Sequence, residues 1–190
     1  MPNNSLYSVD RWAVAETAAP FTIPLTEFRT HNDMAVNLPA AAADDDMGLV
    51  TGTPGTHAPT LQGVDFGGTT SDEEGTFHFS LPNSYIAGAA VTVRVRAGML
   101  TTVSDGTATL DCEAYLDDED GTVSSDSCAT AAQSINSVAL ADYDFVLTTT
   151  YYSPGETVVI NLTFAGSDTG NAGVMACLIT KVQVLCDLRA

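Results

Sequence analysis

The feature that most constrains the fold is the alternation of apolar and polar side chains within residues 76–96. In residues 91–96, three valines alternate with Thr92, Arg94 and Arg96, and residues 77–81 place apolar side chains at every second position. A side-chain period of two is typical of a strand with one buried and one solvated face. Strands of a parallel sheet show continuous apolar runs instead, so these residues predict an antiparallel sheet.

The same kind of pattern recurs at short spacing along the rest of the chain. Turn residues such as Asp105-Gly106 and Pro154-Gly155 separate the apolar segments. Short strands divided by such turns predict an all-β protein, an antiparallel β-sandwich. An immunoglobulin-like sandwich and a closed barrel are alternatives, but about eight strands with unequal loops favour a jelly roll. The strands are predicted at residues 77–81, 90–96, 107–116, 129–135, 142–149, 157–165 and 174–185.

Residues 1–66 differ in composition from residues 67–190. They hold six of the eight prolines, and their strand candidates are short, at residues 22–28, 34–38 and 47–51. Proline is confined to edge strands and irregular chain, so an extended N-terminal arm is predicted here, lying across the domain body or across a neighbour. Residues 67–190 are predicted to form the jelly-roll domain, and the acidic run at residues 72–75 is predicted to be its opening loop.

The charge of the chain argues against several kinds of partner. Six lysines and arginines stand against 24 aspartates and glutamates, a net charge of −18. Binding to the nucleic-acid backbone or to an anionic membrane needs clustered cations, so neither partner is expected. No apolar run approaches the roughly 18 residues of a membrane span, and the N-terminus lacks the basic and apolar regions of a secretory signal.

The sequence offers no assignable catalytic residue, and we expect no enzymatic activity. His31, His57 and His78 are widely separated, and no GxSxG elbow accompanies them. A triad is defined by geometry and not by order in the sequence, but no base stands beside a nucleophile here. With 24 acidic residues, chance pairs of carboxylates are common and carry little information.

No metal or cofactor site is expected either. The acidic runs at residues 44–46 and 117–121 do not match the spacing of a calcium-binding EF-hand loop, and we interpret them as solvated loops. The sequon at Asn161 lies in a predicted strand and is interpreted as a chance match.

The four cysteines show no zinc-binding spacing, and we expect free structural thiols. A Cys112–Cys128 or a Cys128–Cys186 disulfide is the alternative, and the sequence cannot decide the pairing. The four cysteines are Cys112, Cys128, Cys177 and Cys186.

Arg94 and Arg96 are two of only six cationic residues and share one face of a predicted strand. In so acidic a chain they are expected to form ion pairs with acids on an adjacent strand or on another subunit.

Four segments together resemble small structural proteins of tailed phages. They are FHFSLPNSYIAGAAVTVRVRAGM, SCATAAQSIN, YYSPGETVVINLTFAG and ITKVQVLCDL, and the resemblance spans residues 44–187. It implies a jelly-roll capsid cement or decoration protein, made in the host cytoplasm and located on the virion exterior.

Such a protein would form homotrimers and bind the major capsid protein, stabilising the shell by binding only its assembled state. The expected interface residues are Trp12, Phe21 and Phe28 of the arm, as aromatic anchors, together with Arg94 and Arg96.

A carbohydrate-binding β-sandwich of a tail fibre or a secreted protein is the alternative function. Such a protein needs exposed aromatic rings on one sheet face. The candidates are Tyr115, Tyr143, Tyr151 and Tyr152, although their positions would equally suit core and rim residues.

Overall fold

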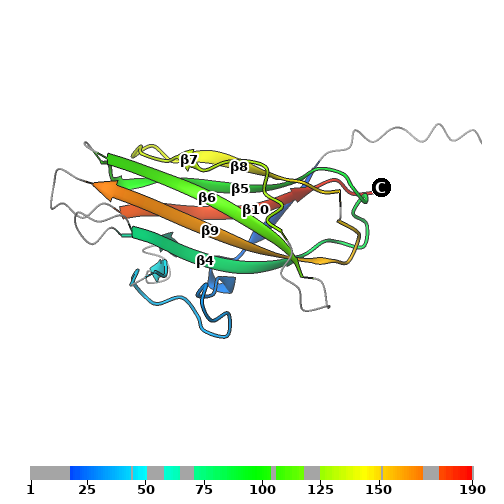
Figure 1. Cartoon of the computed structure of the whole chain (residues 1–190), viewed down its shortest axis with the longest axis horizontal. Helices are drawn as coiled ribbons and strands as arrows, with labels where there is room; N and C mark the ends of the chain where they lie inside the picture. Colours follow the sequence, from blue (N-terminus) through cyan, green and yellow to red (C-terminus); the bar gives the residue numbers. More distant parts are fainter. Residues whose placement is uncertain are drawn as a thin grey trace, which may run out of the picture.

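Two antiparallel β-sheets stacked face to face form the protein (Figure 1). The computed structural model describes residues 18–43, 45–50, 58–64, 71–103, 106–117, 125–150, 152–168 and 176–189. Within these residues, the only helix is a single 3₁₀ turn, η1 (Leu25–Glu27). The described part of the chain therefore holds no helix long and apolar enough to span a membrane.

One sheet has six strands and the other has four. The six-stranded sheet has the order β2-β3-β10-β5-β8, with β1 also paired to β10, and the four-stranded sheet has the order β4-β9-β6-β7. The strands are β1 (Ala19–Ile23), β2 (Gly48–Val50), β3 (Thr60–Gln62), β4 (Ser71–Ser80), β5 (Val91–Thr101), β6 (Gly106–Asp117), β7 (Gln133–Ser134), β8 (Ala141–Leu147), β9 (Thr157–Asp168) and β10 (Ala176–Cys186).

The alternating side chains place the core between the sheets. In β5 the three valines are buried, while Thr92, Arg94 and Arg96 lie on the opposite side of the strand. Burial alternates in the same way along β6 and β10. Burying these apolar side chains is the main driving force for folding, at about 25 cal/mol per Å² of apolar surface. Among the largest side chains in this core are Tyr85, Phe28, Phe77, Phe145 and Phe164.

The prediction of an all-β antiparallel sandwich is confirmed, but several strand bounds were wrong. The acidic residues 72–75 are not a loop, because Glu73 turns its side chain into the core, where its Oε2 accepts a hydrogen bond from the Val64 amide (2.5 Å). Residues 34–38 form a turn instead of a strand, since the Val36 amide donates to the Asp33 carbonyl (2.8 Å). Of residues 129–135, only β7 is a strand, and β3 was not foreseen.

The described residues before β4 lie against the sandwich of their own chain. β1 pairs along β10, and β2 pairs with β3, which in turn pairs with β10. The segment 29–47, which lies between η1 and β2 in the sequence, runs beside the edge strand β4 (Figure 1). There the Arg29 amide donates to the Thr76 carbonyl (2.8 Å), and the Met47 amide donates to the Glu74 carbonyl (2.9 Å). These bonds partly cover an edge that would otherwise expose unpaired backbone groups.

Candidate functional site

The outer side of the four-stranded sheet carries a continuous set of polar side chains. Along three neighbouring strands, every second residue faces away from the core, because successive side chains of a strand point to opposite faces. We call this surface the polar sheet face. It consists of Glu74, Thr76 and His78 on β4, Val159, Asn161 and Thr163 on β9, and Asp111, Glu113 and Tyr115 on β6.

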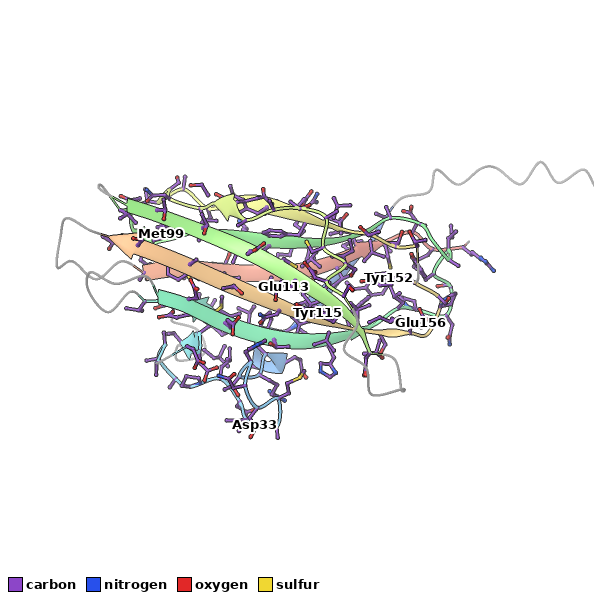
Figure 2. All side chains as sticks on the ribbon, in the orientation of Figure 1. Asp33, Met99, Glu113, Tyr115, Tyr152 and Glu156 are labelled. Carbon is purple, nitrogen blue, oxygen red and sulfur yellow. The ribbon has the colours of Figure 1, made fainter. Side chains whose placement is uncertain are left out.

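The strand register arranges these nine residues in three rows across the sheet. Glu74, Thr163 and Asp111 form one row, Thr76, Asn161 and Glu113 form the middle row, and His78, Val159 and Tyr115 form the third. Figure 2 shows Glu113 and Tyr115 following each other along β6. A flat ligand on this face would therefore meet carboxylates in two rows and an aromatic ring in the third.

A hydrogen-bond network fixes the middle of the polar sheet face. The Thr76 hydroxyl donates to Asn161 Oδ1 (3.0 Å), and Asn161 Nδ2 donates to Glu74 Oε1 (3.2 Å). Thr76 and Asn161 are only 2% and 1% exposed although they lie on the outer side of the sheet. Buried polar groups that are all hydrogen-bonded hold one geometry, so this network makes the face rigid.

The segment 29–47 adds a side wall to this face along β4. His31 Nε2 lies 3.6 Å from Glu74 Oε2, and His31 Nδ1 lies 3.5 Å from the Thr76 hydroxyl. A pocket of about 340 Å³ opens on the same side, and His78 belongs to both the pocket and the polar sheet face. Its other lining residues are Ile23, Pro24, Glu27, Arg29, Met34 and Phe77.

The electrostatics of the face are dominated by carboxylates. The pKa of Tyr115 is raised to about 12, first by burial and then by the neighbouring Glu113 carboxylate. This carboxylate also accepts a hydrogen bond from the phenol. A phenol with so high a pKa stays protonated at neutral pH and can donate a hydrogen bond.

This raised pKa predicts that Tyr115 weakens the protein at alkaline pH. The unfolded chain loses its phenol proton near pH 10, whereas the folded state keeps it until about pH 12. The folded state thus binds more protons in this window, and stability falls as the pH rises through it. Urea unfolding at about pH 9 and about pH 11.5 should show a smaller fall for Tyr115→Phe than for the original protein. Tyr85 and Tyr152 also have raised pKa values, but both proteins contain them, so their effect cancels in the comparison. An equal fall in stability for Tyr115→Phe and the original protein would contradict the prediction.

Of the three described tyrosines among those suggested as sugar platforms, only Tyr115 is found on the outer face of a sheet. Tyr152 is buried, and its hydroxyl contacts that of Ser127. Tyr143 lies on the inward side of β8, packed against the core. Tyr151 lies outside the described residues.

Of the aromatic residues expected at a subunit interface, Phe21 and Phe28 lie against the body of their own chain. Trp12 is outside the described residues. Phe28 is 1% exposed and packs on Phe77, with ring centroids 4.8 Å apart, while Phe21 is half-buried against Phe79 at 5.6 Å. The body of its own chain therefore already encloses Phe28.

Arg94 and Arg96 form ion pairs on the outer face of the six-stranded sheet. Arg94 Nε lies 2.6 Å from Asp144 Oδ1, and Arg96 Nη1 lies 3.1 Å from Asp142 Oδ1. Both acids are on the adjacent strand β8 of the same chain. The sequence left open whether the arginines pair with an adjacent strand or with another subunit, and the structure shows the adjacent strand. The Arg94 guanidinium, as a hydrogen-bond donor, lowers the pKa of Asp144. Exposed pairs of this kind contribute about 0–1 kcal/mol to stability.

The described residues contain no group of three or more His, Cys, Asp or Glu side chains that could hold a metal ion. His57, Asp44 and residues 118–121 lie outside the described part of the chain. The polar sheet face itself could not be found from the sequence, although its residues show the alternation of a strand. Its composition depends on β4, β9 and β6 being neighbours, which only the topology reveals.

Comparison with known proteins shows similarity at the level of structure alone. No protein-family model matches the chain, and no curated protein does. Among solved structures, the tandem CBM22-1-CBM22-2 domain of Paenibacillus barcinonensis Xyn10C matches with a TM-score of 0.50 and 12% identity, over 94% of this chain and 48% of that one. The CBM22-1 xylan-binding domain of the same protein has a TM-score of 0.49 and 13% identity, covering 93% of this chain and 99% of the other.

The xylan-binding module CBM15 aligns over 91% of this chain and 99% of its own, with a TM-score of 0.45 and 12% identity. At such low identity the similarity of the tandem domain shows the fold alone. The tandem domain gives no support to the capsid function implied by the sequence resemblance. The homotrimer, the capsid partner and the virion location stay predictions. The chain has the β-sandwich fold of these carbohydrate-binding modules.

Proposed function

We propose that this protein binds carbohydrate through the polar sheet face. The observation that carries the proposal is the half-buried Tyr115 beside carboxylates, on a face that the buried hydrogen-bond network of Thr76 and Asn161 holds rigid. Sugars present hydroxyl groups around an apolar ring face, so a site for them combines fixed donors and acceptors with an aromatic surface. The polar sheet face offers both within three adjacent strands.

The charges on this face favour a neutral glycan. Glu74, Asp111 and Glu113 are carboxylates, and the whole chain carries a net charge of −18. Ionised carboxylates accept hydrogen bonds from sugar hydroxyls, and charge-assisted bonds of this kind are the stronger ones. The same charges would repel the carboxylates or sulfates of acidic polysaccharides. Xylan is the first ligand to test, because two of the similar structures are described as xylan-binding.

Affinity electrophoresis in gels containing xylan, mannan, β-glucan or polygalacturonate tests the proposal directly. At least one neutral polysaccharide should retard the protein, and polygalacturonate should not. Tyr115→Ala is expected to weaken the affinity about tenfold or more, the usual loss when a central aromatic contact is removed. Failure of every neutral polysaccharide to retard the protein would reject the proposal.

A matched pair of variants separates the two sheet faces. Glu113→Gln changes a carboxylate of the polar sheet face to an amide, and Asp142→Asn makes the same change on the outer face of the other sheet. We expect weaker retardation for Glu113→Gln and unchanged retardation for Asp142→Asn. The opposite result would move the site to the six-stranded sheet.

The proposal is binding without hydrolysis. Long incubation with each polysaccharide should release no reducing sugar. Release of sugar that disappears in Glu113→Gln would show that the carboxylates cleave the glycan, and would contradict a purely binding role.

A further inference from the structure

Two of the four cysteine side chains lie beside each other along β6. Cys112, in the middle of β6, points into the core and is 1% exposed, whereas Cys128 lies half-buried in the described segment that begins at residue 125. The two thiols lie close enough to shift each other's pKa: Cys128 raises the pKa of Cys112, and Cys112 lowers that of Cys128. Both are reduced in this structure.

Hydrogen bonds hold residues 126–128 beside β6, the strand that carries Cys112. The Ser127 amide donates to the Ala114 carbonyl (2.8 Å), and the Ala114 amide donates to Asp126 Oδ1 (2.9 Å). Asp126 Oδ1 also accepts the Cys128 amide (2.8 Å), and Cys128 forms a bridge with Leu147 of β8. The fold thus keeps Cys128 beside the strand that carries Cys112, which is the proximity that a disulfide requires.

We propose that Cys112 and Cys128 are an oxidation site, and that a small-molecule disulfide such as oxidised glutathione converts them into an intrachain disulfide. The other two cysteines are fully buried inside the sheets. Cys177 Sγ accepts the Gly63 amide (3.0 Å), and its thiol is 0% exposed, so a small-molecule disulfide does not reach it.

The reaction proceeds by two thiol–disulfide exchanges. Cys128 is the accessible thiol, and the hydrogen bond from Cys112 lowers its pKa. Its thiolate attacks one sulfur of oxidised glutathione, forming a mixed disulfide and releasing one glutathione thiolate, which takes up a proton. The Cys112 thiol then loses its proton to solvent and attacks the Cys128 sulfur, releasing the second glutathione. The protein dithiol loses two electrons and two protons, and oxidised glutathione becomes two molecules of reduced glutathione.

Closing this bridge would link β6 to the segment that carries Asp126 and Ser127. A disulfide stabilises a protein by restricting the unfolded chain, and the effect grows with the length of the closed loop. For a loop of about 15 residues in a protein of this size, we expect Tm to rise by about 6–12 °C on oxidation.

The experiment treats the whole protein with oxidised glutathione and maps its peptides by mass spectrometry without reduction. The expected result is one peptide pair joined through Cys112 and Cys128, two remaining free thiols and the rise in Tm. Cys128→Ser should remove the rise, and Cys186→Ala, the matched control, should keep it. Four free thiols after treatment, a bridge between any other pair, or an equal rise in Cys128→Ser would overturn the proposal. Because the peptide map uses the original protein, it decides the question even if a variant fails to fold.

Discussion

Phe28→Ala is expected to lower the free energy of unfolding by about 3–5 kcal/mol, the usual cost of truncating a fully buried phenylalanine. Phe28 is 1% exposed, and its ring packs on Phe77. The substitution removes this contact and leaves a cavity beneath the segment 29–47, whose backbone bonds to β4 depend on the same anchor. Urea unfolding followed by tryptophan fluorescence and circular dichroism measures the loss.

Phe21→Ala is the control, because Phe21 is also an aromatic residue of the N-terminal segment but is only half-buried. Its loss of stability should be clearly smaller than that of Phe28→Ala. If Phe28 were instead an anchor for another subunit, the variant would change the native mass and leave the monomer's stability nearly unchanged. Analytical ultracentrifugation of both variants distinguishes the two roles.

Gly48→Ala is expected to destabilise the protein by about 3 kcal/mol or more, at the upper end of the cost of overpacking. A Cβ added at Gly48 would lie 2.2 Å from the Ala42 nitrogen and 2.4 Å from the Ala41 carbonyl carbon. These are backbone atoms, so no side-chain rotation relieves the clash. The hydrogen bond from the Leu49 amide to the Pro39 carbonyl (2.7 Å) keeps β2 close to the segment that contains residues 41–42.

Gly88→Ala provides the comparison, since Gly88 has room for a side chain but a positive φ of 76°. A left-handed backbone costs a residue with a Cβ about 1–2 kcal/mol. Thermal unfolding should therefore rank Gly48→Ala as the more damaging change. The reverse order would mean that residues 41–42 can move away from β2.

The sequence predicted the central strands well because their side chains alternate strictly. Residues 91–96 and 157–165 both lie within observed strands, and in residues 91–96 the three valines are the buried positions. In residues 157–165 the match is weaker, since Val159 lies on the outer face and the polar Asn161 is buried. The alternation of apolar and polar residues did not predict the strand at Glu73, because a carboxylate at a core position is more typical of a loop. It also failed at residues 34–38, where apolar Met34 and Val36 are on an exposed turn.

The candidate site was harder to foresee, for a reason that lies in the topology. Tyr115 was one of four tyrosines considered, and nothing in the sequence distinguishes it from Tyr152, which is buried. Likewise, Thr76 and Asn161 are 85 residues apart and become partners only because β4 and β9 are neighbours. Phe28 was expected at a subunit interface because its surroundings in the sequence are proline-rich, a pattern that does not reveal burial by another part of the same chain.

The pairing of β10 has a consequence for the order of events during synthesis. β1 and β3 share one edge of β10, which comes much later in the sequence, and β2 pairs with β3. Among the described strands, β1 therefore has no partner in its sheet, and β2 and β3 have only each other, until β10 has been synthesised. Contacts between such distant segments slow folding into the range of milliseconds to seconds. In the nascent chain, these early strands expose unpaired edges, so chaperones that shield extended apolar segments are expected to raise the yield of folded protein.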